Sequence, residues 1–332
     1  MSGAAQTAVV QIPASGPDSL SEYDLSEFKA RNAMGLRFVG SCTVLTAAAL
    51  ALSSFPHPAS WLAGQVLLAF ALLQWFAILH EAGHNTLFRT KRLNQMAGRL
   101  GAIFAMIPFG CWKMVHGMHH HWTGWQDLDM TTAPLVPRRL AWIERTVLNL
   151  CWKCWLPLFS ILYRVNNYWN LYRMFRFFPE TRQRRKLFVS VLSLLAIYAL
   201  LTYAVGIEQL ARLVGLGVLL TLVMQDPLIL SQHTHIPLKV SGGESAPPFV
   251  PLEQEVFTRS LRFPRWFSTN VLLQMDAHEL HHMYPRIPGY YLDRLGFTPR
   301  NEVHWWKWVR RAKRVPAEVF LFQNRDQSGL DI

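Results

Sequence analysis

The sequence predicts an all-α integral membrane protein with four transmembrane helices in two hairpins, interfacial helices and a cytoplasmic cap that carries histidine boxes. Three observations lead to this fold class. Hydrophobic residues make up 51% of the chain and charged residues only 16%, whereas soluble domains carry about a quarter charged residues. Four apolar stretches approach the length of about 20 helical residues that crosses a bilayer core. The histidines are clustered rather than scattered, and on the proposed topology the clusters lie at or just beyond the cytoplasmic ends of helices.

The four apolar stretches pair into two hairpins. They cover residues 38–55, 61–79, 187–207 and 213–230. A short turn around Pro56 and Pro58 joins the first two stretches, and a turn from Gly206 to Arg212 is expected to join the last two. The last stretch stays apolar until Gln225, Asp226 and Pro227 near its end.

The basic residues predict how these hairpins are oriented. The chain has 33 Lys and Arg residues against 21 Asp and Glu residues, a net charge of +12. Between the hairpins lie Arg89, Lys91, Arg92, Arg138, Arg139, Arg173, Arg176, Arg182, Arg184, Arg185 and Lys186. By the positive-inside rule, this middle segment and both termini are cytoplasmic. Anionic lipid and this rule explain the excess better than nucleic acid, which is not an expected partner.

Two shorter apolar pieces, 101–111 and 147–162, are too short or too interrupted to span a bilayer. They are expected to lie at the membrane interface, with Trp152 and Trp155 in the headgroup region.

The chain is expected to divide into a polar cytoplasmic N-terminal tail (1–35), a membrane domain (36–300) and a basic cytoplasmic C-terminal tail (301–332). The first thirty residues contain no apolar signal-peptide core, so export is not expected.

Histidines form four clusters on one predicted side of the membrane. These are His80 and His84, then His116, His119 and His120, then His233, and finally His278, His281 and His282. Residues three and four apart share a helix face, so the imidazoles of each box converge. One zinc ion needs three or four ligands, and nine nitrogens match two metal ions. Imidazole binds iron, zinc, copper or nickel, so ligand type alone does not identify the metal.

Two other classes of function compete with a two-metal enzyme. The stretch His80-Glu81-Ala-Gly-His84 is also the HExxH pattern of zinc proteases, in which Glu81 would be the general base. That hypothesis leaves both HxxHH clusters unexplained. A membrane protein that stores or moves metal would need polar groups at mid-membrane, and the four stretches lack them.

The motifs around these histidines resemble those of the membrane fatty acid desaturases and hydroxylases. That family has boxes of the form HxxxH, HxxHH and HxxHH, and a further histidine after the last span. The run from His116 to Asp129 is similar to the family's HxxHHxxTxxxDxD, and the run from His281 to Leu292 to its HHLxPxxPxYxL. The segment Gln232-His233-Thr-His235 resembles the family's QHTH. The resemblance extends from about His80 to Leu292.

The resemblance implies a di-iron centre that uses O2 as co-substrate and removes hydrogen from an acyl chain. The implied iron ligands are His80, His84, His116, His119, His120, His233, His278, His281 and His282. The electrons come from a separate carrier of the ferredoxin, rubredoxin or cytochrome b5 type. The sequence has no fused cytochrome b5 motif and no ferredoxin-type cysteine run, in agreement with an external donor.

Several polar residues beside the boxes are candidates to orient the ligands, because a metal-bound imidazole usually donates its second N–H to a carboxylate or carbonyl. They are Glu81, Asp127, Asp129, Asp226, His235, Asp276 and Glu279.

The substrate is expected to be a fatty acid or fatty acyl derivative in the membrane, held in a narrow apolar tunnel. Candidate lining residues are Trp75, Phe76, Phe104, Phe109 and Trp112. Desaturation has the larger share in the family and is the expected reaction. Hydroxylation, acetylenation and oxidative decarboxylation begin with the same hydrogen abstraction and stay open, as does the head group of the substrate.

Overall fold

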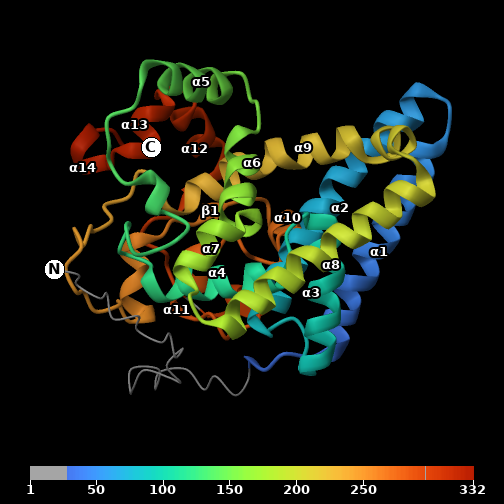
Figure 1. The fold of residues 1–332 in the computed structure, drawn as a ribbon, viewed down its shortest axis with the longest axis horizontal. Helices are drawn as coiled ribbons and strands as arrows, with labels where there is room; N and C mark the ends of the chain where they lie inside the picture. The colour runs from blue at the N-terminus through green and yellow to red at the C-terminus, as the bar shows by residue number, and fades with distance from the viewer. Residues whose placement is uncertain (1–27, 296) are drawn as a thin grey trace.

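The four longest helices form two hairpins, as the sequence predicts (Figure 1). The computed structural model describes residues 28–295 and 297–332. The hairpin helices are α1 (Asn32–Ser54), α2 (Pro58–His84), α8 (Thr181–Val205) and α9 (Ile207–His233). All four are long and apolar enough to cross a membrane. Both hairpin turns lie at one end of the molecule, and α11 lies toward the other end (Figure 1).

The second hairpin turn is much tighter than expected. Helix α8 ends at Val205 and α9 begins at Ile207, so Gly206 alone makes the turn. Its φ of 85° lies in the left-handed region, which glycine adopts without a Cβ clash. The predicted turn ran on to Arg212, which instead lies inside α9. The prediction failed because the polar residues after Gly206 were read as part of the turn, whereas a helix also accommodates polar residues at its end.

Helix α2 is the centre of the membrane part. It packs against α1, α3 (Lys91–Ala105) and α9. In the most apolar 18-residue stretch of α2, 72% of the residues are buried. In the same kind of stretch of α8, which lies at the periphery, 11% are buried. Near its end, Gly83 leaves room for an aromatic side chain of α4 (Phe109–Trp122), because a Cβ at this position would lie 1.8 Å from the Trp112 ring. This close packing sets the end of α2 against α4.

Two pairs of shorter helices are sharply bent. Helices α3 and α4 meet at 98°, and α5 (Trp142–Lys153) meets the segment Leu158–Trp169 at 114°. The second segment comprises α6 (Leu158–Arg164) and the π-helical turn η4 (Val165–Trp169). The apolar pieces 101–111 and 147–162 cross these two bends, so neither forms a single helix. Proline cannot continue a helix without losing a hydrogen bond, and Pro108 and Pro157 stand at the bends.

Trp152 packs inside the protein, and its predicted position in the headgroup region stays a prediction. This side chain is only 2% exposed. Its ring stacks on Phe320 at 4.9 Å, and its indole N–H donates to the Ala312 carbonyl at 3.1 Å. Trp155 is 42% exposed.

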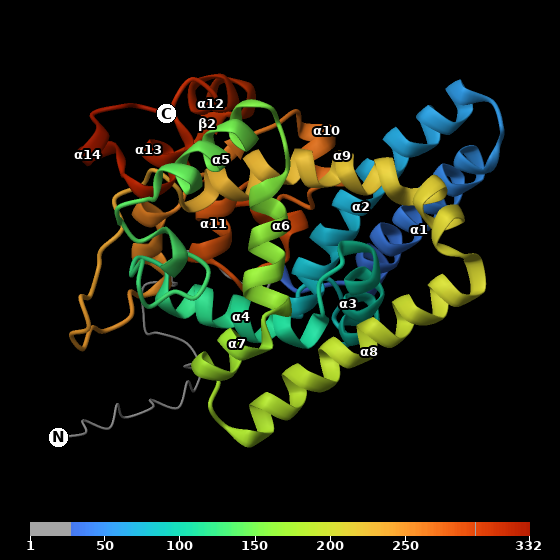
Figure 2. The same ribbon diagram turned by 45° about the horizontal axis from the view of Figure 1, so that its top comes forward.

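Shorter elements build the cap (Figure 2). They are η3 (Ala133–Leu135), α7 (Leu171–Phe177), η5 (Pro251–Phe257), β1 (Leu261–Arg262), α10 (Arg265–Asn270), α11 (His278–Met283), η6 (Gly289–Arg294), β2 (Val303–His304), α12 (Trp305–Ala312), α13 (Ala317–Phe322) and α14 (Arg325–Ser328). Strands β1 and β2 pair in parallel. Within the predicted C-terminal tail, Trp308 and Phe320 are buried with Leu148 of α5. The domain boundaries stay predictions, and 1–27 of the predicted N-terminal tail lie outside the described residues.

Candidate metal centre

The nine histidines predicted as ligands lie together, although four separate helices carry them. His80 and His84 end α2, three lie on α4, His233 ends α9, and three lie on α11. Eight of them form two sets in which one ring nitrogen from each residue lies within 4.8 Å of the others. The first histidine group is His80, His84, His116 and His281, and the second histidine group is His119, His233, His278 and His282.

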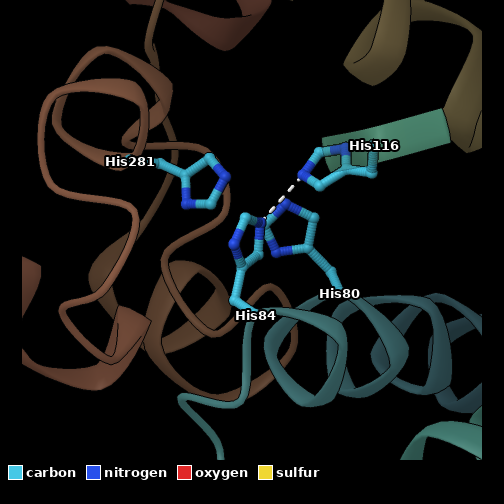
Figure 3. A group of neighbouring side chains, drawn as sticks. All are labelled: His80, His84, His116 and His281. Atoms are coloured by element: carbon cyan, nitrogen blue, oxygen red, sulfur yellow. Dashed lines mark hydrogen bonds between the residues drawn. The ribbon is translucent and has the colours of Figure 1, made fainter. Parts of the chain in front are cut away.

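The rings of the first histidine group point toward one another (Figure 3). The Nε2 atoms of His84 and His116 are 2.9 Å apart. The ninth histidine, His120, adjoins this group, because its Nε2 lies 3.1 Å from that of His116 and 3.0 Å from that of His281. Both ring nitrogens of His80 are buried without a hydrogen-bond partner among the described residues.

The second histidine group has the same arrangement. The Nε2 atom of His278 lies 2.8 Å from that of His233 and 3.1 Å from that of His282. The ring centroids of His119 and His233 are 4.6 Å apart. His233, which stands outside any box in the sequence, thus belongs to this group and is carried by the end of α9.

In the second histidine group, three imidazoles have a hydrogen-bonding partner at Nδ1, so that their Nε2 atoms face the centre of the group. The Nδ1 atom of His119 lies 2.7 Å from Asp129, which Thr131 also contacts. The Nδ1 atom of His282 donates to the Gln254 side-chain oxygen at 2.9 Å, and that of His233 to the Phe257 carbonyl at 3.2 Å. Such partners fix the tautomer of a metal-binding imidazole and raise its basicity.

Two of the predicted orienting carboxylates lie beside a ring. Asp129 is one. The other is Glu81, whose Oε1 lies 3.5 Å from Nδ1 of His80. The Glu81 carboxylate accepts hydrogen bonds from the Thr86 hydroxyl at 2.8 Å and the Gly289 amide at 2.9 Å. It therefore joins the end of α2 to η6.

The remaining predicted orienting residues lie elsewhere and make no described hydrogen bond to the nine histidines. Asp127 accepts from the Ser241 and Gly242 amides, Asp226 from the Ser160 amide, Asp276 from the Ser268 hydroxyl and Glu279 from the Asn301 amide. His235 binds the C-terminal segment through both ring nitrogens. For these five residues, closeness in sequence to a box was misleading.

Sequence reasoning missed Gln254 and the Phe257 carbonyl. Both belong to η5, more than twenty residues before α11. The Gln254 amide also donates to the His120 carbonyl at 2.8 Å, so one side chain ties α4 to α11. A glutamine in a polar loop and a main-chain carbonyl carry no spacing pattern that would have revealed this role.

The two groups fit metal cations. At Nε2–Nε2 distances of 2.8–3.1 Å, at most one nitrogen of each pair carries a proton, so each pair presents at least one lone pair to the centre of its group. Burial, followed by the influence of neighbouring imidazoles, holds the pKa of His278, His281 and His282 well below 6.5. Neutral rings of this kind are ready ligands. Although burial alone would raise the pKa of Asp129, the adjacent His119 and the Thr131 amide hold it below its usual value.

A cavity of about 70 Å³ lies against both histidine groups. Its apolar wall includes Phe76, Trp112, Ile229 and Met275. Of the other predicted lining residues, Trp75 stacks on Phe104 at 4.8 Å, and Phe109 packs at Gly98 of α3. These three aromatic rings do not line the cavity and belong to the packing between helices.

Comparison with known proteins identifies the family. The family model for fatty acid desaturases matches residues 56–308. The chain therefore belongs to the fatty acid desaturase family, and it is an oxidoreductase with helices suited to a membrane.

Curated relatives carry the same kind of name. The sn-1 oleoyl-lipid 12-desaturase of a Picosynechococcus species is 25% identical over 283 residues, which cover 82% of this chain and 77% of the relative. The chloroplastic sn-2 acyl-lipid omega-3 desaturase (ferredoxin) of Helianthus annuus is 26% identical, over 65% of this chain and 50% of the relative. The endoplasmic reticulum omega-6 fatty acid desaturase of Brassica juncea is 23% identical, over 71% of this chain and 66% of the relative. The chain thus spans from half to about three quarters of these proteins.

Proposed function

We propose that this protein is an O2-dependent di-iron oxidase that introduces a double bond into the acyl chain of a fatty acid or fatty acyl derivative. The observation that carries the proposal is the pair of histidine groups, each with four inward-facing ring nitrogens beside one apolar cavity. The names of the relatives, which describe acyl-chain desaturases, support the same reaction.

The nine histidines would hold the two metal ions. His80, His84, His116, His120 and His281 would serve one iron, and His119, His233, His278 and His282 the other. When bound, the iron pair supplies O2 activation and the removal of hydrogen from an unactivated C–H bond. Overall, an acyl chain, O2, two electrons and two protons give the olefin and two molecules of water.

The protein's own residues prepare the site for that reaction. Asp129, Gln254 and the Phe257 carbonyl hold three imidazoles in one tautomer and one orientation. The apolar side chains of Phe76, Ile229 and Met275 bind methylene groups and exclude water from the cavity. Positioning of this kind is the protein's main contribution where a metal performs the difficult chemistry.

The electrons come from an external donor of the ferredoxin, rubredoxin or cytochrome b5 type. The name of the Helianthus annuus relative includes ferredoxin, which supports this part of the proposal. We further propose that the metal centre and both termini face the cytoplasm. The histidine groups lie at the ends of α2 and α9 that are opposite the two hairpin turns, and basic residues are concentrated between the hairpins.

A zinc protease built on His80-Glu81-Ala-Gly-His84 is less well supported. Glu81 is engaged by Thr86 and Gly289, and it does not line the cavity beside His80. Hydroxylation, acetylenation and oxidative decarboxylation use the same centre, and the products distinguish them.

Product analysis tests the proposal. The purified protein, loaded with iron and given a reduced donor, O2 and a fatty acyl lipid, should yield a chain two hydrogen atoms lighter. His278→Ala should give no product, while Gln95→Ala on the exposed face of α3 should remain active. A product that is one oxygen atom heavier would replace desaturation by hydroxylation, and cleavage of a peptide without O2 would favour the protease.

A further inference from the structure

Two tyrosines lie in the wall of the cavity beside the histidine groups, which we call the metal cavity. Tyr163 and Tyr168 line it together with His119 and Thr131. Their hydroxyl oxygens are 3.2 Å apart, at hydrogen-bonding distance. Tyr168 is only 1% exposed, and Tyr163 packs against the same core cluster. A pair of hydroxyl groups, the tyrosine pair, is thus built into the wall of a cavity suited to an acyl chain.

A rare backbone conformation brings the two tyrosines together. Tyr163 and Tyr168 are five residues apart, and in an α-helix such residues point about 140° away from each other. Here the helix widens. Val165–Trp169 form the π-helical turn η4, and the Asn170 amide donates to the Val165 carbonyl, five residues earlier, at 2.9 Å. In a turn of this kind residues five apart lie on nearly the same face, so both rings reach the same wall of the cavity.

The π-helical turn is held in place from two sides. The Arg173 guanidinium donates to the Asn167 side-chain oxygen at 2.6 Å and to the Asn166 carbonyl at 3.3 Å. The Trp169 indole N–H donates to the Met106 carbonyl at 2.9 Å. π-helical turns are rare and are frequent at functional sites, and an uncommon backbone conformation persists where the surrounding structure holds it. The fold therefore fixes the position of the tyrosine pair.

The tyrosine pair has one more hydrogen than its internal contact uses. Each phenol carries one O–H donor. Whichever hydroxyl donates, one hydrogen lies between the two oxygens, and the other has no acceptor among the described residues. A hydroxyl group is costly to bury without a partner. The pair therefore offers one hydrogen-bond donor to a molecule in the metal cavity.

We propose that the tyrosine pair binds an oxygen atom of a molecule held in the metal cavity, beside the second histidine group. This inference rests on the proposed function for the identity of that molecule. The proposed reaction brings two sources of oxygen to the cavity, the carbonyl group of the acyl substrate and O2. Either oxygen accepts a hydrogen bond from a phenol. A bound carbonyl would place the reacting carbon atoms near the carbonyl end of the chain, whereas a bound O2 would make the pair a hydrogen-bond donor during its reduction to water.

Ligand affinity tests the carbonyl as the partner. A fatty acid methyl ester and the alkyl methyl ether of equal length, which lacks the carbonyl oxygen, are bound to the full-length, iron-loaded protein in lipid nanodiscs without O2. If the pair binds the carbonyl, Tyr163→Phe and Tyr168→Phe should each weaken binding of the ester about fivefold, the net value of one hydrogen bond, and leave the ether unchanged. Tyr172→Phe is the matched control, because Tyr172 of α7 is 77% exposed and should affect neither ligand.

The yield of product per O2 consumed tests O2 as the partner. With a reduced donor and substrate, the unmodified protein should form one olefin for each O2 that is reduced to water. If the pair binds an oxygen of O2, Tyr163→Phe should lower this ratio about fivefold, while the affinity for the ester stays the same. The O2 that yields no olefin should then take up two electrons and two protons and leave as H2O2. Tyr172→Phe should keep the original ratio.

One result overturns the proposal: Tyr163→Phe and Tyr168→Phe that match Tyr172→Phe both in ester affinity and in product per O2. Thermal unfolding midpoints show that each variant is folded, and Tyr163→Phe alone decides the question if Tyr168→Phe unfolds. If the unmodified protein forms olefin under that result, the proposed function stands without this role for the tyrosines. If ester affinity depends on the pair but the unmodified protein oxidises no acyl chain, the binding site stands and the proposed function fails.

Discussion

The carboxylate of Asp129 lies 2.7 Å from Nδ1 of His119, and both side chains are buried. This contact joins the loop after α4 to the second histidine group. It fixes the His119 ring so that its Nε2 atom faces the other three imidazoles. The same pairing of a carboxylate and an imidazole raises the basicity of a metal-binding histidine.

Loss of this carboxylate should weaken metal binding. Asp129→Asn keeps the shape of the side chain but removes its negative charge. We expect iron affinity or turnover to fall about 10–100-fold, the usual cost of removing a partner of a ligand. Iron content by elemental analysis and turnover are the measurements. Asp127→Asn is a matched control, because Asp127 contacts Ser241 and Gly242 instead. Equal losses in the two variants would contradict the role of Asp129.

His233 and His235 should differ sharply when each is changed to alanine. His233→Ala removes a nitrogen from the second histidine group, so we expect iron content and activity to be lost while the protein still folds. His235→Ala should keep its iron, because both ring nitrogens of His235 contact the C-terminal segment. Limited proteolysis should then show faster cleavage after about residue 322. If His235→Ala loses iron and His233→Ala retains it, the wrong histidine of this pair has been assigned to the metal.

These two residues also illustrate what the sequence could reveal and what it could not. The HxxxH and HxxHH spacings are local, so the helical period alone brought His80 toward His84 and His278 toward His281 and His282. The orientation of the His235 side chain depends on the backbone conformation of one residue. Helix α9 ends at His233, and His235 adopts a φ of 59°. No residue pattern predicted that change.

Contacts between distant segments were equally hard to predict. Gln254 reaches His282 across 28 positions, and no periodicity relates η5 to α11. Helix α2 could be predicted from its hydropathy, whereas the one-residue turn at Gly206 could not, since the first turns of α9 contain the polar residues Glu208, Gln209 and Arg212.

Adding a methyl group at Gly83, which is not one of the metal ligands, should weaken the metal centre. The Cβ of Gly83→Ala would lie 1.8 Å from the Trp112 ring, and Trp112 stacks on His116 at 4.3 Å. Overpacking of this kind costs about 1–3 kcal/mol. Thermal unfolding in detergent should show a lower midpoint, with less bound iron. Gly40→Ala in α1 is the control, because its Cβ would meet nothing within 4 Å. An unchanged midpoint for Gly83→Ala would show that α2 and α4 can separate freely.

Acid should destabilise the metal-free protein. The folded-state pKa values of His278, His281 and His282 lie well below 6.5, their value in an unfolded chain, chiefly because the rings are buried. As the pH falls below about 6.5, the unfolded chain takes up protons that the folded protein excludes. Stability is therefore full above this pH and declines below it. Unfolding midpoints of the metal-free protein between pH 8 and pH 5 measure the effect. A midpoint that rises on acidification would mean that these rings are protonated in the fold.

The number and identity of bound metal ions test the central claim most directly. After anaerobic purification from iron-replete cells, elemental analysis should find two iron atoms per chain, with less iron in both His84→Ala and His278→Ala, which change one residue in each histidine group. A single zinc ion that is lost in His84→Ala but kept in His278→Ala would contradict the account, since it would mean that only His80, His84 and their neighbours bind metal.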